Sequence, residues 1–218
     1  ALRKRKSRDP ESFFCVNSRK KTEKREKDQP SSISDSTSSS SVATLDCFPY
    51  PGVSGLSTCM NVVDVSEEQA LLDFIDGQPW NSSLKRRTQH YGYEYSYRTR
   101  SLPERVAPIP TEFSSVVSRM CALTKMPPPE QLIVNEYLPG QGISAHIDHP
   151  LLFGEQIVSI ALGSSCVMRF ARTKPKSRAD KKGAKEHPYH DVWFARRSLV
   201  LLSGEARWEY THCIPARK

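Results

Sequence analysis

Two segments in the first half of the chain carry apolar residues at the spacing of an amphipathic helix. Residues 66–77 begin with Ser66 and have Gln69 three positions later, which is the spacing of an N-terminal capping box. Gly77 suits the C-terminal end of this predicted helix. Its apolar stripe consists of Leu71, Leu72, Phe74 and Ile75. A second helix is expected over 111–123, where the same spacing is kept by Phe113, Val116, Val117 and Met120.

Beyond Pro129 the pattern changes to short runs rich in β-branched and aromatic residues, with turn residues and no helical spacing between them. The predicted strands cover residues 131–138, 143–148, 156–162, 166–171, 190–194, 198–202 and 207–212. Many short strands in close succession favour an antiparallel sandwich or barrel. The sequence therefore predicts a mainly β domain with flanking helices, and an exposed basic insertion at 172–187.

The N-terminal part of the chain has a different composition. Residues 1 to about 45 contain few large apolar side chains, so we expect them to be disordered, and 48–55 has the composition of a turn-rich linker. We therefore divide the chain into a tail and linker at 1–55 and a folded domain at 56–218.

The positive charge is concentrated in this tail. The 218 residues carry a formal net charge of +8, and residues 1–30 contain 11 Lys or Arg against 5 Asp or Glu, which leaves only +2 for the rest. Basic runs at 3–6 and 18–27 fit a nuclear-entry signal or a nucleic-acid-binding arm, and they fit a solvated tail equally well.

Several classes of protein are disfavoured. No run approaches the roughly 18 apolar residues of a membrane-spanning helix, and residues 1–10 contain no recognisable secretory signal. The six cysteines include no CxxC pair, so we expect free thiols, with Cys121 and Cys166 packed as small apolar groups. These features favour a monomer with no membrane association, located in the nucleus, the cytoplasm or both.

The predicted strand ISAHIDHP places three ionisable side chains where burial is costly unless something binds them. Residues two apart on a strand share a face, so His146 and Asp148 should point the same way. His212 closes the last predicted strand, on the face that also holds Trp208 and Tyr210. Two histidines and one carboxylate with open positions form the ligand set of non-haem Fe(II) oxygenases, although HxD spacing alone is weakly specific.

Other side chains extend or compete with this site. Asn135 and Tyr137 share a face of the preceding strand, where they either hold a carboxylate ligand beside the metal or form an ordinary polar pair. A zinc or structural metal site is a weaker alternative, because its spacing matches no usual zinc finger. Its ligands would be His187, His190, His212 and Cys213.

Longer motifs give a specific resemblance. NEYLPGQGISAHIDHPLLFGEQIVSIALGSSCVMRF (135–170), followed by RRSLVLLSGEARWEYTH (196–212), resembles the AlkB family of Fe(II)/2-oxoglutarate dioxygenases, and the likeness covers about residues 60–218. RRTQHYGYEY (86–95) is similar to the branch that contains the eighth AlkB homologue, which acts on the wobble uridine of tRNA.

The resemblance implies a double-stranded β-helix, or jelly roll, with an N-terminal helical layer. It implies that His146, Asp148 and His212 bind a catalytic Fe(II). It also implies that Asn135 and Tyr137 hydrogen-bond 2-oxoglutarate, with O2 as the second cosubstrate. Such an enzyme hydroxylates or demethylates a base in RNA, tRNA or alkylated DNA while 2-oxoglutarate becomes succinate and CO2.

The resemblance also places a substrate lid over 86–95. Its candidate contacts are Arg87, Gln89, His90, Tyr91 and Tyr93. The alternating tyrosines at 91, 93, 95 and 97 either stack a base that has left its duplex or pack along a strand edge. The insertion 172–187, with seven Lys or Arg and two Asp or Glu, is either a phosphate-contacting loop or a solvated excursion.

One feature of the family has no counterpart. The family ends with two arginines, six positions apart, on a strand beyond the last metal histidine, and the first pairs with the distal carboxylate of 2-oxoglutarate. This sequence reaches Lys218 soon after His212, and Arg217 lies too close to His212 for that role. We expect a jelly roll without its C-terminal strand, from a truncated chain whose longer transcript supplies the arginines. A replaced arginine and an inactive product are the alternatives.

Two further functions fit the same fold. One is a non-catalytic jelly-roll module that binds nucleic acid, and the other is a protein hydroxylase with the same iron chemistry. Assembly of the Fe(II)–2-oxoglutarate site, and succinate release with and without nucleic acid, distinguish these functions from a nucleic-acid dioxygenase.

Overall fold

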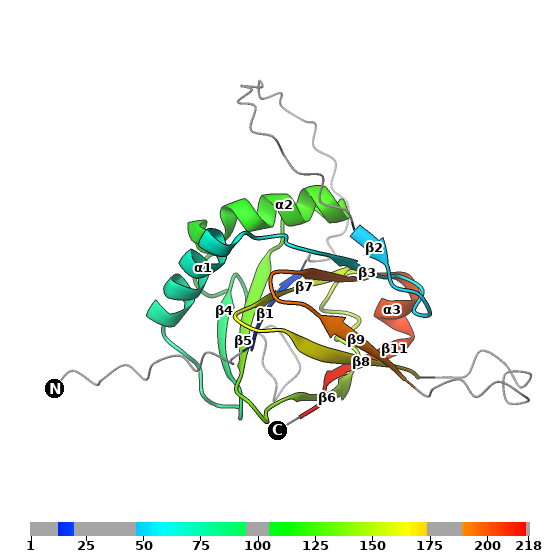
Figure 1. Ribbon diagram of the computed structural model, residues 1–218. Helices are drawn as coiled ribbons and strands as arrows, with labels where there is room; N and C mark the ends of the chain where they lie inside the picture. The colour runs from blue at the N-terminus through cyan, green and yellow to red at the C-terminus, as the bar shows by residue number, and fades with distance from the viewer. Residues whose placement is uncertain (1–12, 20–46, 95–104, 174–188, 217–218) are drawn as a thin grey trace, which may run out of the picture.

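The computed structural model describes residues 13–19, 47–94, 105–173 and 189–216. A seven-stranded and a four-stranded antiparallel sheet face each other, and helices cover the outer face of the larger sheet (Figure 1). This arrangement confirms the predicted mainly β fold with flanking helices. The two sheets are not joined into a closed barrel over the described residues.

The larger sheet has the order β2-β3-β10-β7-β1-β5-β4, and the smaller has the order β6-β11-β8-β9. The strands of the larger sheet are β1 (Phe13–Arg19), β2 (Cys47–Pro49), β3 (Leu56–Cys59), β4 (Arg87–Tyr91), β5 (Gln131–Tyr137), β7 (Ile157–Leu162) and β10 (Leu199–Leu202). The smaller sheet contains β6 (Ile143–His146), β8 (Cys166–Arg172), β9 (His190–Phe194) and β11 (Tyr210–Ile214).

Alternate residues of β5 face two separate cores. Leu132 and Val134 pack in the core beneath the helices, whereas Tyr137 belongs to the core between the two sheets. The strand is buried along its whole length, so polar side chains on its inner face are held away from water. Asn135, two residues before Tyr137, shares that inner face.

The helical layer consists of α1 (Val65–Gly77), η1 (Thr111–Phe113) and α2 (Ser114–Thr124). The start of α1 differs from the prediction. Asp64 caps the helix by accepting the N–H of Glu67 at 2.7 Å, and the hydroxyl of Ser66 donates to the same carboxylate. The predicted capping box is therefore wrong, because a carboxylate two residues earlier is the stronger acceptor.

β1 lies inside the segment that the sequence predicted to be disordered. Val16 pairs with Val134 of β5 on one side and with Ile160 of β7 on the other, so this strand is internal to the larger sheet (Figure 1). β2 also begins before residue 56. Composition misses both strands, because β1 pairs with strands far away in the sequence and β2 is only three residues long. The rest of the predicted tail lies outside the described residues.

A disulfide joins Cys47 and Cys59, which corrects the prediction of free thiols for these two residues. They are directly opposite each other on β2 and β3, with a Cα–Cα distance of 4.2 Å, and cross-strand register is not visible in residue spacing. Cys121 and Cys166 are free, half-buried and packed against the two cores, as predicted.

The region before the last strand also differs from the prediction. A short helix, α3 (Gly204–Trp208), replaces the first residues of the expected strand, so Trp208 does not share a strand face with His212. The insertion beyond Thr173 lies outside the described residues. None of the helices that the structure describes is long and apolar enough to cross a membrane.

Candidate metal centre and cosubstrate site

Cross-strand register brings the predicted metal ligands together. His146 on β6 and His212 on β11 are directly opposite each other, with ring centroids 4.4 Å apart. Asp148 follows β6 in a loop, and its Oδ1 and Oδ2 lie 3.9 Å from His146 Nε2 and 3.6 Å from His212 Nε2. One ligand atom from each of the three residues lies within 4.8 Å of the others.

Both imidazoles can present an unprotonated Nε2. His146 Nδ1 lies 2.8 Å from the carbonyl oxygen of Ser144. Because a carbonyl only accepts, Nδ1 of the neutral ring carries the proton and Nε2 keeps its lone pair. Burial lowers the pKa of His212 to about 4, although the nearby carboxylate of Asp148 acts in the opposite direction. Neutral imidazole is the form that binds a metal ion.

The carboxylate of Asp148 is the least satisfied group in this cluster. Its Oδ2 is buried and has no hydrogen-bond partner among the described residues. A buried acceptor without a donor is costly, and a bound cation removes that cost. Two imidazoles and one carboxylate suit Fe(II) and leave positions open for other ligands, so these residues fit an Fe(II) ion.

The alternative zinc site is not assembled. His190 packs beside Tyr210, with ring centroids 6.4 Å apart, and burial raises the pKa of the Cys213 thiol. His187 lies outside the described residues. Within the part of the chain that the structure describes, the His146, Asp148 and His212 cluster is the one group with metal-binding spacing.

Asn135 and Tyr137 lie side by side on the inner face of β5, with 3% and 5% of their surfaces exposed. Arg86 connects them. Its Nε donates to Asn135 Oδ1 at 2.9 Å, and its guanidinium lies 6.0 Å from the ring of Tyr137. Because the amide oxygen is engaged, the amide NH2 is left to donate to an acceptor such as a carboxylate. Sequence reasoning assigned the motif containing Arg86 to the lid and missed this contact.

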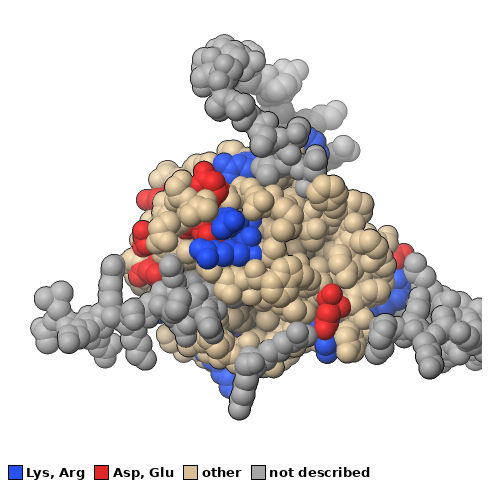
Figure 2. Space-filling view, viewed as in Figure 1, with Lys and Arg blue, Asp and Glu red and all other residues tan. Residues whose placement is uncertain are grey.

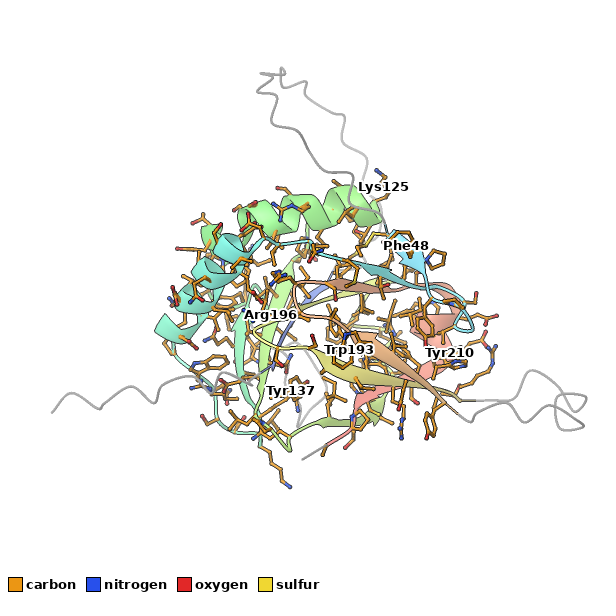
Figure 3. The ribbon with its side chains drawn as sticks, in the orientation of Figure 1. Phe48, Lys125, Tyr137, Trp193, Arg196 and Tyr210 are labelled. Atoms are coloured by element: carbon orange, nitrogen blue, oxygen red, sulfur yellow. A yellow bond between two sulfur atoms is a disulfide. The ribbon has the colours of Figure 1, made fainter. Side chains whose placement is uncertain are left out.

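A pocket of about 260 Å³ opens at the same end of the two sheets. Tyr137, Cys166, Trp193 and Ile214 contribute to its lining, and Figure 3 labels Tyr137 and Trp193. Tyr137 and Ile214 follow Asn135 and His212 by two residues on their strands, so the pocket adjoins the candidate site. Trp193 is 64% exposed at the pocket, and sequence reasoning identified it only as an aromatic residue in a predicted strand.

Three of the five predicted substrate contacts lie on the opposite face of the sheet. Arg87 pairs with Glu136. The amide of Gln89 donates to the carbonyl of Ile75 in α1, and the buried hydroxyl of Tyr91 donates to Gln89. These three side chains therefore point away from the candidate metal centre, and their contact with a substrate stays a prediction. The sequence could not show it, because alternation places neighbouring residues on opposite faces.

The other two predicted substrate contacts are His90 and Tyr93, and they remain candidates for that role. His90 pairs in register with Ile133, next to the Thr88–Asn135 pair, so it lies on the inner face of the sheet. It is half-buried, and burial lowers its pKa. Tyr93 is half-buried, and its carbonyl accepts the side-chain amide of Gln131 at 2.7 Å. The tyrosines at 95 and 97 lie outside the described residues.

Comparison with known proteins decides the family. The model of the 2OG-Fe(II) oxygenase superfamily matches residues 75–218. The chain belongs to this superfamily. Membership implies Fe(II), 2-oxoglutarate and O2, which agrees with the donor set of the cluster.

Similar proteins refine this assignment. The alkylated DNA repair protein ALKBH8 homolog of Arabidopsis thaliana is 34% identical over 193 residues, covering 79% of this chain and 56% of that protein. The tRNA (carboxymethyluridine(34)-5-O)-methyltransferase ALKBH8 of Mus musculus is 33% identical over 181 residues, covering 75% and 24%. The alpha-ketoglutarate-dependent dioxygenase alkB homolog 4 of Homo sapiens is 31% identical over 196 residues, covering 78% and 64%.

These similarities confirm the resemblance to AlkB homologues and to the eighth-homologue branch. The chain spans between 24% and 64% of the length of these relatives. The solved structure of OsALKBH1 superposes with a TM-score of 0.61 at 13% identity, covering 79% of this chain and 88% of that one. That likeness concerns the fold, which is the jelly roll of the AlkB family.

Proposed function

We propose that this protein is an Fe(II)/2-oxoglutarate-dependent dioxygenase that oxidises a modified base in nucleic acid, with tRNA as the first substrate class to test. The convergence of His146, Asp148 and His212 within 4.8 Å supports the proposal most directly. The buried, unpartnered Oδ2 of Asp148 supports it further, because a cation at that point would satisfy the carboxylate.

The side chains would divide the work as follows. His146, Asp148 and His212 would hold Fe(II), and Asn135 and Tyr137 would bind 2-oxoglutarate. Bound Fe(II) and 2-oxoglutarate supply the chemistry by which O2 oxidises a C–H bond of the base. The carboxylate offsets part of the charge of the cation, while the two neutral imidazoles donate lone pairs without adding charge.

The enclosed setting suits this chemistry. Phe170 lies behind His212, with ring centroids 6.1 Å apart, and its side chain is fully buried. Apolar packing on that side of the cluster keeps water from the imidazole and from the ligands beside it. The pocket lined by Tyr137 and Ile214 is one opening at this end of the sheets by which a cosubstrate could approach.

The names of the relatives support a nucleic-acid substrate. The Mus musculus relative is named as a tRNA methyltransferase, and a Danio rerio relative, 27% identical, is named as a probable RNA/DNA demethylase. Since this chain matches 24% of the Mus musculus protein, the name indicates a substrate class and not the reaction. His90, on the inner face of the larger sheet, is a described candidate for contact with an unstacked base.

The basic tail and the insertion are the proposed phosphate-contacting segments. On the face shown in Figure 2, Lys and Arg side chains gather in one main group near the helical layer, and most of the remaining described surface is uncharged. We further expect a monomer located in the nucleus, the cytoplasm or both.

The test has two stages. Anaerobic addition of Fe(II) and 2-oxoglutarate should produce a weak visible charge-transfer band, and the Asp148→Ala variant should lack it. Succinate release is then measured without nucleic acid, with anticodon stem-loop RNA and with a methylated DNA oligonucleotide. Release stimulated by one of the nucleic acids supports the proposal and identifies the substrate class.

Each alternative predicts a different result. A non-catalytic module would bind nucleic acid without producing the band. A protein hydroxylase would produce the band without stimulation by either nucleic acid. The Arg87→Ala variant is the matched control, because Arg87 faces away from the site and should leave both measurements unchanged.

A further inference from the structure

Arg207 is a fully buried cation beside the candidate metal centre. It lies in α3, five residues before His212, and only 1% of its surface is exposed. Burying a guanidinium is costly unless its N–H groups are hydrogen-bonded. The hydrogen bonds of Arg207 therefore indicate why a guanidinium is buried at this position.

The guanidinium donates three hydrogen bonds, and their acceptors all lie in one loop. Nε donates to the carbonyl of Gly154 at 3.0 Å, Nη1 to the carbonyl of Asp148 at 3.1 Å, and Nη2 to the carbonyl of Phe153 at 3.2 Å. The ring of Trp208 packs against the guanidinium at 4.1 Å. Arg207 thus connects both ends of the loop 148–154 to α3.

This loop begins at a candidate metal ligand. β6 ends at His146, so no ladder of sheet hydrogen bonds fixes Asp148. Within the loop, the N–H groups of Leu152 and Phe153 turn back to the carbonyl of His149. The hydrogen bond from Arg207 therefore restrains the backbone of Asp148 from outside the loop. The carboxylate of Asp148 faces both histidines, so this restraint acts on a candidate metal ligand.

The charge environment of Arg207 is also unusual for this chain. Other arginines form ion pairs with carboxylates, namely Arg87, Arg119, Arg169, Arg172 and Arg196. Arg207 bonds to backbone carbonyls, and the carboxylate that acts on it electrostatically is that of Asp148. Asp148 is thus influenced by Arg207 through its backbone position and through charge.

We infer that Arg207 is a positioning residue that holds Asp148 in place, and that metal affinity depends on it although it does not contact the metal. This inference rests on the proposed metal centre. Residues that orient metal ligands from behind typically change metal affinity about 10- to 100-fold when they are replaced. The inference therefore predicts a loss of affinity larger than any loss that follows from lower stability alone.

The test measures binding of Mn(II), a redox-silent probe for the Fe(II) position, by calorimetric titration of the full chain, with thermal unfolding measured in parallel. Arg207→Met removes the three hydrogen bonds and the charge, and we expect at least about tenfold weaker Mn(II) binding. Arg207→Lys keeps the charge but cannot span three carbonyls, so we expect a smaller loss of affinity.

Arg172→Met is the matched control. Arg172, on β8, contacts Glu205 of α3, Glu209 and the hydroxyl of Tyr210, and these partners lie outside the loop 148–154. The same substitution there should lower the melting temperature and leave Mn(II) affinity within about twofold of the wild type, because the ligand loop is intact.

The outcomes separate the two proposals. If the wild type binds no Mn(II), the proposed metal centre itself fails. If the wild type binds Mn(II) and both Arg207 variants bind it equally well, the positioning role of Arg207 is overturned while the metal centre stands. Should Arg207→Met not fold, Arg207→Lys decides the question, because unchanged affinity in that variant would also overturn the role.

Discussion

Glu68 and Arg207 are both fully buried charged side chains, but their charges are neutralised in different ways. Both carboxylate oxygens of Glu68 accept from Arg196 at 2.9 Å, and its Oε1 also accepts the N–H of Gly163. Arg197 adds a second guanidinium at 3.8 Å. Arg207 instead donates hydrogen bonds to the backbone carbonyls of Asp148, Phe153 and Gly154.

This difference indicates that Glu68 stabilises the fold, whereas Arg207 positions a residue of the candidate metal centre. Glu68 joins α1 to the turns that follow β7 and β9, and Figure 3 shows Arg196 between the helical layer and the smaller sheet. Opposite charges hold these elements together without any ligand. Arg207 lies beside the cluster of one carboxylate and two imidazoles, and the opposite charge that acts on it is the carboxylate of Asp148, which is also a proposed ligand of the metal ion.

Removal of the carboxylate at the metal centre should have the largest effect. In Asp148→Ala we expect succinate release to fall by at least about 1000-fold, equivalent to roughly 4 kcal/mol, because a ligand of the proposed cation is lost. The free energy of unfolding should not decrease much, since the variant removes a buried oxygen that has no hydrogen-bond partner. Urea unfolding monitored by fluorescence measures this quantity. Retained turnover would rule out Asp148 as a ligand.

Removal of the charge on Glu68 should have the opposite effect to Asp148→Ala: stability should fall and metal binding should not change. In Glu68→Gln two guanidiniums lose their carboxylate in a buried setting, and we expect the free energy of unfolding to fall by about 3 kcal/mol. Mn(II) affinity of the folded protein should not change. Glu67→Gln is the control, because its partly exposed pair with Arg119 should contribute about 1 kcal/mol or less. Equal losses of unfolding free energy in Glu68→Gln and Glu67→Gln would contradict the expected difference between the two carboxylates.

The sequence predicted most of the fold and the metal ligands, because these depend on local pattern and on an ordered set of motifs. Apolar periodicity located α1, and runs of β-type residues located the strands from β5 to β10. The histidines and the carboxylate were found through motifs in which residue type and order together are specific. Their convergence depends on the register between β6 and β11.

The features that were missed depend on long-range pairing. β1 is a short run between charged segments, and its partners β5 and β7 lie more than a hundred residues away in the chain. The disulfide depends on the register between β2 and β3. A motif also does not tell which face of the sheet each residue occupies, and Arg87, Gln89 and Tyr91 lie on the outer face.

Two adjacent arginines extend the comparison to the cosubstrate site. Arg86 holds Asn135 on the inner face, whereas Arg87 pairs with Glu136 on the outer face. In Arg86→Ala we expect the KM for 2-oxoglutarate to rise about tenfold, because the loss of one hydrogen bond to Asn135 leaves its amide free to turn. Arg87→Ala should leave this KM unchanged. Initial-rate measurements over a range of 2-oxoglutarate concentrations test the pair, and equal KM values in both variants would remove Arg86 from the site.

The smallest effect is expected from removing one guanidinium from Glu68. In Arg196→Met the free energy of unfolding should fall by about 1 kcal/mol, because Arg197 and the N–H of Gly163 still contact the carboxylate. The Arg196 side chain is 44% exposed, so water replaces part of its contribution. The loss should therefore be smaller than in Glu68→Gln.

A double variant sharpens this last prediction. Glu68→Met combined with Arg196→Met replaces an ion pair with a buried carboxylate by apolar side chains of similar length, which often restores stability. We expect the double variant to be more stable than Glu68→Met alone, since fewer unpaired charges remain in the core. If the two losses simply add, the carboxylate and Arg196 act independently, and charge pairing is not what holds α1 to the turns of the sheets.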